Sequence, residues 1–219
     1  VDHDPESVDG RGIPKHWRRF GVVDFGYTNP FVCQWWAMDD DGRLYLYREI
    51  YMSQRTVRTH AELIRSLSDG EVIEATICDH DAEDRATLAE NGIITRPADK
   101  AISAGIQAVA QRLAPGPDGR PRLFILRGCT VEVDWRMEES GKPTSTEQEF
   151  PGYVWTRTAD GRPVKEVPVA VDNHGVDAVR YAVAYADDLA RMHVGPARRT
   201  LVATVRHGGA PATDPAEIA

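Results

Sequence analysis

The stretch GVVDFG at residues 21–26 places an aspartate, Asp24, inside a run of hydrophobic residues. An ionised carboxylate in the middle of a buried strand is costly unless a partner offsets its charge. Gly26, two residues later, allows a backbone or a ligand to approach closely. The pattern predicts a central strand that carries a functional acid; the alternative is an edge strand on which Asp24 faces water.

Two more strand-like runs follow this stretch along the chain. They are FVCQWWAM at 31–38 and LYLYREIYM at 44–52, and the residues between them, Asp-Asp-Asp-Gly at 39–42, are typical of a turn. Together with FGVVDFG at 20–26, these runs predict an antiparallel three-stranded meander.

The rest of the chain alternates between helical and strand-like patterns. The predicted helices cover 56–68, 84–90, 102–113 and 173–192, and the predicted strands cover 72–78, 93–96 and 122–126. GYVWTR (152–157) and RPVKEVPV (162–169) predict a β-hairpin, whereas 128–150 has no clear pattern. This order predicts an α/β fold with a mixed central sheet, helices on both faces and an added hairpin.

The length of 219 residues suits one sizeable domain. We expect residues 1–17 to form a linker or arm, 18–194 to form the domain, and 195–219 to form a flexible tail. The chain begins with Val rather than Met, so we expect a piece of a longer protein. No apolar run approaches the roughly 18 residues that cross a membrane, and no secretory signal is visible, so no membrane partner is expected.

Charge and cysteine content narrow the classes of function. The net charge of −8 argues against a domain that grips nucleic acid by itself, since phosphate neutralisation supplies most non-specific affinity. It argues less against a metal-dependent nuclease, whose carboxylates are neutralised by the ions. The three cysteines are far apart, and Cys33 and Cys78 sit in apolar runs, which predicts buried free thiols in a reducing cytoplasm.

A second acidic segment, TICDHD at 76–81, ends another apolar run. Parallel strands deliver the side chains at their ends to a ligand crevice, which favours Asp79 as a functional acid. Asp81 is its main rival. The alternative reading is a loop whose acids cap the next helix, a role that we expect of Asp84.

A third acid, Asp177, lies in the helical stretch NHGVDAVRYA at 173–182. His174 is three residues earlier and therefore on the same helix face. Arg180 is three residues later, so a solvated Asp177–Arg180 pair without any function is an equally good reading of the spacing.

Three such carboxylates suit divalent metal ions. Two metals about 3.5–4 Å apart need several carboxylates, one of them bridging, and Mg²⁺ prefers hard oxygen ligands. Asp24, central and rigid, is the natural bridging ligand, with Asp79 and Asp177 holding one ion each. The constellation predicts phosphodiester chemistry.

Four segments in order resemble the C-terminal nuclease domain of the large terminase subunit of tailed bacteriophages, over roughly residues 18–190. They are GVVDFGYTNPF, ICDHDAEDRATLAENGI, ADKAISAGIQAV, and EQEFPGYVW followed by VDNHGVDAVRYA. The last is the most specific of the four. The second departs from the family's commoner pattern, which leaves the choice between Asp79 and Asp81 open.

The resemblance implies an RNase H-like fold and a two-metal endonuclease that uses Mg²⁺ or Mn²⁺. It implies metal binding and catalysis by Asp24, Asp79 and Asp177, with His174 close by. It also implies cleavage of double-stranded viral DNA during genome packaging, in the host cytoplasm and transiently at the procapsid portal. The partners implied are DNA, an N-terminal ATPase domain, the portal protein and the small terminase subunit.

Basic residues are candidates for contact with the DNA backbone. Lys100 and Arg180 could offset phosphate charge near the acids, and Arg18 and Arg19 lie at the start of the first strand. No ATPase motif is expected in this segment, because the only Gly-Lys pair, Gly141-Lys142, lacks the flanking residues of a phosphate-binding loop.

Three rival readings remain. One is another RNase H-like nuclease, such as a junction resolvase or a transposase core. Another is an ATPase of the sugar-kinase and actin-like group, which would need a second phosphate loop with paired glycines that ICDHDAED does not have. The third is a non-catalytic packaging module on which the acids are merely solvated.

Overall fold

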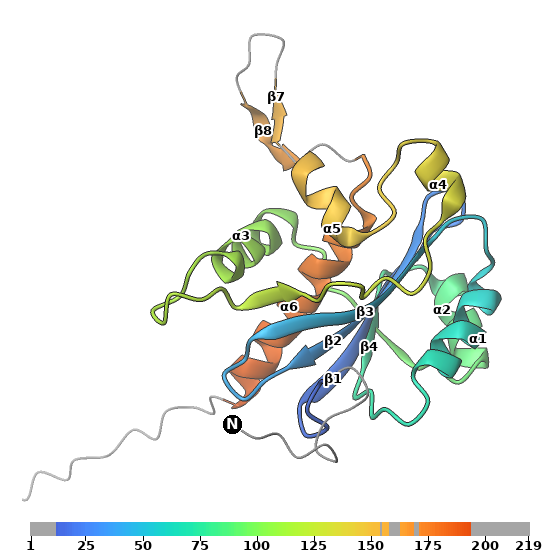
Figure 1. Cartoon of the computed structure of the whole chain (residues 1–219), viewed down its shortest axis with the longest axis horizontal. Helices are drawn as coiled ribbons and strands as arrows, with labels where there is room; N and C mark the ends of the chain where they lie inside the picture. Colours follow the sequence, from blue (N-terminus) through green and yellow to red (C-terminus); the bar gives the residue numbers. More distant parts are fainter. Residues whose placement is uncertain (1–11, 154, 158–162, 169–170, 194–219) are drawn as a thin grey trace, which may run out of the picture.

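A mixed six-stranded sheet forms the centre of the protein (Figure 1). The computed structural model describes residues 12–153, 155–157, 163–168 and 171–193. Strand order across the sheet is β5-β4-β1-β2-β3-β6. The strands are β1 Arg18–Asp24, β2 Phe31–Met38, β3 Leu44–Met52, β4 Thr76–Cys78, β5 Thr95–Pro97 and β6 Leu123–Ile125. A separate hairpin pairs β7 Trp155–Arg157 with β8 Pro163–Pro168 and projects beyond the sheet.

The directions of the strands bring most of their carboxyl ends to one edge of the sheet. β1, β2 and β3 form the predicted antiparallel meander, whereas β4 runs parallel to β1, β5 parallel to β4 and β6 parallel to β3. Only β2 therefore runs in the opposite direction. The carboxyl ends of the other five strands lie along a common edge, which is where ligands bind in sheets of this kind.

Helices cover both faces of the sheet, as predicted. They are α1 Val57–Leu67, α2 Ala82–Glu90, α3 Ile102–Leu113, α4 Trp135–Glu139, α5 Thr146–Glu149 and α6 His174–His193, with a 3₁₀ turn at Phe150–Gly152. One apolar core joins α1 and α2 to Val23 and Cys33, and the other joins α3 and α6 to Val22 and Trp36. Because side chains alternate along a strand, Asp24 faces the α6 side, like Val22.

Some boundaries differ from the sequence prediction. β4 begins at Thr76 rather than at residue 72. Val72 is 85% exposed, so the first residue of the predicted strand does not pack into the core. The helix predicted from 84 begins at Ala82, since Asp81 and not Asp84 accepts the backbone hydrogen bonds at its start. The patternless stretch 128–150 contains the short helices α4 and α5.

All three cysteines are buried free thiols, as predicted for Cys33 and Cys78. In the described ranges, we find no helix with the length and apolar character needed to cross a membrane. The expected tail at 195–219 lies outside the described residues, as does the expected arm up to residue 11; of residues 12–17, Ile13 is buried in the core on the α1 side of the sheet.

Candidate functional site

Asp24 ends β1 at the edge where the strand ends meet, and only 7% of it is exposed. Gly26 shapes the turn that follows, because a Cβ there would lie 2.4 Å from the carbonyl oxygen of Pro30. Burial raises the pKa of Asp24, and the charges of Asp177 and Asp79 add to the rise, while His174 acts against it. The two other predicted acids are therefore close enough to repel the Asp24 carboxylate.

Asp79 directly follows the neighbouring strand β4, beside Asp24. Val23 pairs with Cys78 in the parallel register of β1 and β4, so the next residues of the two strands are adjacent. Partial burial would raise the pKa of Asp79, but hydrogen bonds from the Lys100 ammonium and the His80 backbone N–H lower it overall. Lys100 lies in the loop between β5 and α3, so the loop's ammonium faces this acid.

Asp81, the sequence rival of Asp79, has a different place. Its Oδ1 accepts hydrogen bonds from the backbone N–H of Glu83 at 3.1 Å and of Asp84 at 3.0 Å. It is thus the N-cap of α2, and its side chain is committed to the helix start. The geometry favours Asp79 over Asp81 as the partner of Asp24.

The start of α6 supplies the third acid and a histidine. His174 Nδ1 lies 2.8 Å from Asp24 Oδ2, which joins β1 directly to α6. Burial would lower the pKa of His174, but the hydrogen bond and charge of Asp24 raise it overall. Asp177, one turn later, accepts a 3.1 Å hydrogen bond from the Asn173 side chain.

Arg180 is a buried partner of Asp177. Its Nε and Nη2 donate to Asp177 Oδ1 at 3.1 and 2.8 Å, and only 4% of the residue is exposed. The solvated surface pair that the spacing allowed is therefore not what the structure shows. This geometry favours a role in orienting Asp177 over a contact with DNA.

Arg18 and Arg19 lie far from the acids, at the opposite end of β1. A strand of seven residues spans roughly 20 Å. Arg18 pairs with Glu74 at 2.9 Å, and Arg19 is 5% exposed with Glu71 3.6 Å away. Neither arginine faces the acidic edge of the sheet.

The donor atoms suit a divalent metal, although they are not gathered around one point. Within the described ranges, no three His, Cys, Asp or Glu side chains converge closely enough to hold an ion. Each acid is instead paired with a basic side chain of the protein: Asp24 with His174, Asp79 with Lys100 and Asp177 with Arg180. Hard carboxylates that repel one another across a partly buried edge are the donors that Mg²⁺ or Mn²⁺ favours.

Some contributors to the site lie within the segments quoted above, although the sequence does not single them out as site residues. Asn173 is one, and Glu149 of α5, which binds the first turn of α6, is another. Glu149 falls in the patternless stretch, but Ser145 and Gln148 just before it fit a capping box, a signal that predicts a helix start.

Solved structures with similar folds are terminases. The chain matches the large terminase of the thermophilic bacteriophage D6E with a TM-score of 0.60 and 23% identity, over 83% of this chain and 42% of that one. It matches the P22 large terminase nuclease domain with a TM-score of 0.57 and 18% identity, over 85% of this chain and 91% of that one. For the large terminase nuclease of the thermophilic phage G20c, the values are 0.51 and 16%, over 78% and 82%.

At these identities the likeness establishes the fold. The chain has the RNase H-like fold found in large terminase nuclease domains, which confirms the fold expected from the four motifs. It spans less than half of the D6E protein. No protein-family model matches the sequence, and no curated protein is significantly similar to it.

Proposed function

We propose that this chain is a metal-dependent endonuclease domain that cuts double-stranded viral DNA during genome packaging. The observation that carries the proposal is the place of Asp24, Asp79 and Asp177. They lie at the ends of the adjacent strands β1 and β4 and on the helix packed over them, close enough to act on one another's charge. Carboxylates at this edge of a sheet are what two-metal phosphodiester hydrolysis requires.

Mg²⁺ or Mn²⁺ ions held by Asp24, Asp79 and Asp177 would supply Lewis acidity for attack of water on phosphorus and for departure of the 3′ oxygen. The chain's own residues hold the acids in place. His174 orients Asp24, and Arg180 orients Asp177. Lys100, whose side chain is 45% exposed, is the basic group best placed to meet a phosphate beside Asp79.

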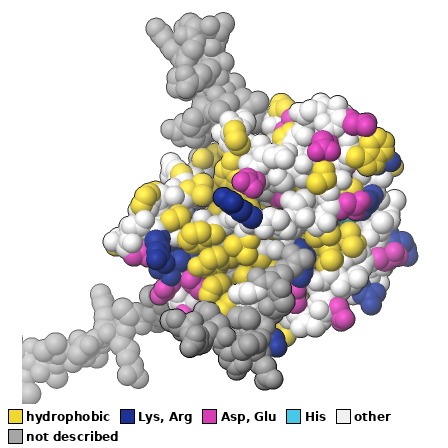
Figure 2. All heavy atoms as spheres, viewed as in Figure 1, with side chains coloured by type: hydrophobic (Ala, Val, Ile, Leu, Met, Phe, Trp, Pro, Cys, Tyr) yellow, Lys and Arg dark blue, Asp and Glu magenta, His cyan; other side chains and the backbone are white. Residues whose placement is uncertain are grey.

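The charge of the chain bears on how DNA is held. The net charge is −8, and the face shown in Figure 2 has acidic and basic side chains interspersed around apolar ones. A surface of this kind binds a polyanion weakly and with strong salt dependence. We infer that most of the grip on DNA comes from the rest of a packaging assembly, such as an ATPase domain, the portal and a small terminase subunit.

The test is digestion of plasmid DNA with Mg²⁺ or Mn²⁺ and with EDTA. We expect cleavage that EDTA abolishes, and losses on the order of 10³ for Asp24→Asn, Asp79→Asn and Asp177→Asn. Asp81→Asn is the matched control, because asparagine caps helices as well as aspartate does. Full activity of Asp79→Asn with a dead Asp81→Asn would move the second acid to residue 81.

A non-catalytic packaging module is the second candidate. It is favoured by the finding that each acid is already paired with a basic side chain of the protein. Thermal unfolding with and without millimolar Mn²⁺ separates the two candidates. A nuclease site binds the ion and melts higher, and Asp24→Asn removes the rise; a wild type that neither cuts DNA nor responds to Mn²⁺ supports the module.

A further inference from the structure

A buried polar network lies beneath the first turn of α6. Its centre is Glu149, of which 1% is exposed. Glu149 Oε1 accepts hydrogen bonds from the backbone N–H of Gly175 at 3.0 Å and from the Tyr51 hydroxyl at 2.6 Å. Its Oε2 accepts from the N–H of Val176 at 2.7 Å. One carboxylate therefore satisfies two of the N–H groups that the start of a helix leaves without partners.

A second set of contacts joins the same turn to the sheet. Gln34 of β2 donates from Nε2 to the carbonyl of Gly175 at 2.9 Å and to Thr146 Oγ1 at 2.7 Å. The Thr146 hydroxyl in turn donates to Glu49 of β3, and the Thr146 N–H does so at 3.2 Å. We call Gln34, Glu49, Tyr51, Thr146 and Glu149 the α6 clamp.

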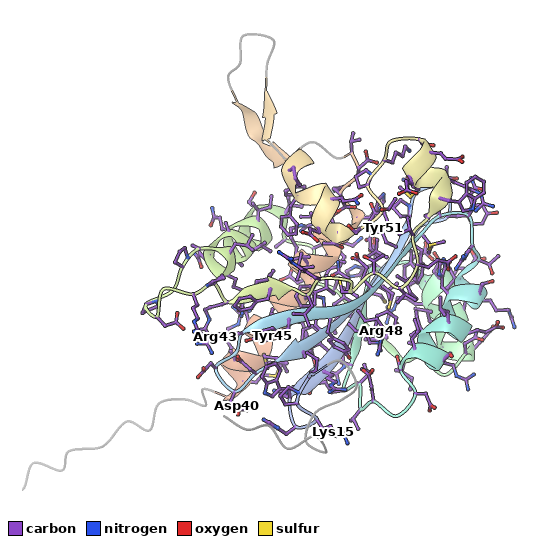
Figure 3. The ribbon with its side chains drawn as sticks, in the orientation of Figure 1. Lys15, Asp40, Arg43, Tyr45, Arg48 and Tyr51 are labelled. Carbon is purple, nitrogen blue, oxygen red and sulfur yellow. The ribbon has the colours of Figure 1, made fainter. Side chains whose placement is uncertain are left out.

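The clamp works at very short range. A Cβ at Gly175 would lie 2.3 Å from Thr146 Oγ1 and 2.9 Å from Thr146 Cα, so α5 and α6 touch through backbone at this point. Figure 3 shows Tyr51 at the end of β3 nearest α5, with Tyr45 at the opposite end. The sheet, α5 and α6 thus meet at Gly175, a position of α6 that has no side chain.

The residues that the clamp holds are flanked by two members of the candidate site. His174 immediately precedes Gly175, and Asp177 immediately follows Val176. From this single turn His174 contacts Asp24 at 2.8 Å, and the charge of Asp177 acts on the same acid. A shift of the turn would therefore displace both at once.

We propose that Glu149 is a positioning residue, which fixes the first turn of α6 so that His174 and Asp177 stand in register with Asp24. The inference rests on the proposed function, because the register matters only if the acids act together. A carboxylate suits this place, since it accepts at both oxygens and its charge favours a helix N-terminus. Glutamine would turn an NH₂ group toward one of the N–H donors.

The experiment compares Glu149→Gln with Asp134→Asn. Asp134 is the matched control: it is fully buried, and its hydrogen bonds within the described residues come from the start of α4 and from Ser53 rather than from α6. We expect both variants to lose thermal stability. Glu149→Gln should also lose about 10-fold to 100-fold in kcat at unchanged KM, because a displacement of about 1 Å has that effect. The kcat of Asp134→Asn should stay within about twofold of the wild-type value.

A second readout does not depend on turnover. The rise in melting temperature with Mn²⁺ should be smaller for Glu149→Gln than for the wild type and unchanged for Asp134→Asn. If Glu149→Gln does not fold, Tyr51→Phe decides, since it removes one donor to Glu149 and should shift kcat and the Mn²⁺ response in the same direction. The proposal is overturned if the Glu149 or Tyr51 variant has the same kcat and the same Mn²⁺ response as the Asp134→Asn control. A wild type that cuts no DNA instead overturns the proposed function.

Discussion

The two ends of β1 carry ionic clusters that differ in how they are balanced. At the amino end, Arg19 and Arg48 both pair with Glu71, and all three side chains are at least nine-tenths buried. Tyr47 adds a 2.5 Å hydrogen bond to Glu71. At the carboxyl end, three acids repel one another: Asp24 is buried, whereas Asp79 and its partner Lys100 are 29% and 45% exposed.

This difference indicates that the cluster at the amino end stabilises the fold, whereas the charged groups at the carboxyl end can exchange partners. Buried charges that have each other as partners are costly to disrupt, because removing one leaves the others without compensation. Charges that are partly exposed lose little when a partner leaves, since water replaces it. The amino end is therefore expected to govern stability, and the carboxyl end to govern chemistry.

The largest effect on stability is expected for Glu71→Ala. It removes the buried acid that both guanidinium groups share, which should cost about 3–5 kcal/mol in the free energy of unfolding. Denaturant titration measures this loss. At a temperature where Glu71→Ala is folded, its rate of DNA cleavage should match that of the wild type. Asp24→Asn should instead be inactive and as stable as the wild type. Similar stabilities for Glu71→Ala and the wild type would remove the contrast.

The next effect is expected for Gly175→Ala, at the contact between α5 and α6. The added Cβ would overlap Thr146, whose backbone cannot move aside, so we expect a loss of about 1–3 kcal/mol. Gly105→Ala on α3 is the control, because its Cβ would meet Arg180 at an ordinary 3.4 Å. That control should be neutral or slightly stabilising, as for glycine to alanine within a helix. Equal melting temperatures for the two variants would contradict the close approach.

An effect of similar size, confined to a change of pH, follows from the pKa of Glu149, which burial raises to about 7. The folded protein then holds a proton that the unfolded chain releases, so this contribution to stability is complete below about pH 4.5 and is lost as the pH rises through about 7. We expect the wild type to lose about 1–3 kcal/mol between pH 5 and pH 8 relative to Glu149→Gln. Denaturant unfolding of both proteins at the two pH values measures this difference. An equal change in the free energy of unfolding for both proteins would refute the prediction.

The smallest effect is expected for Arg18→Ala. Its pair with Glu74 is partly exposed, with side chains 36% and 25% accessible, and such pairs contribute about 0.2–1 kcal/mol. Because Arg18 lies at the far end of β1 from the acids, DNA cleavage should be unchanged at every salt concentration. A variant whose cleavage became more sensitive to salt would restore Arg18 as a DNA contact.

The sequence predicts the parts of the site that lie on strands. Asp24 stands out because a hydrophobic strand has few reasons to contain a carboxylate, and the mixed sheet follows from the alternation of runs. The choice between Asp79 and Asp81 could not be made from spacing, because it depends on the register of β4 against β1. That register is a contact between segments more than 50 residues apart.

The clamp escapes sequence analysis for a related reason. α5 has four residues, which is too short for any periodicity, and Glu149 reads as one more surface acid. Its burial arises from the packing of α6 above it and Tyr51 beneath it. The burial of Arg180 likewise depends on α3 lying close to α6 at Gly105.

The length of α6 has a mechanical consequence. Its 20 residues form a rod about 30 Å long, with His174 and Asp177 at one end. A rod of that length converts a tilt of about 3° around its far end into a movement of about 1.5 Å at His174. A force on the remote half of α6 would therefore move His174 and Asp177, and the clamp at the first turn restrains that movement.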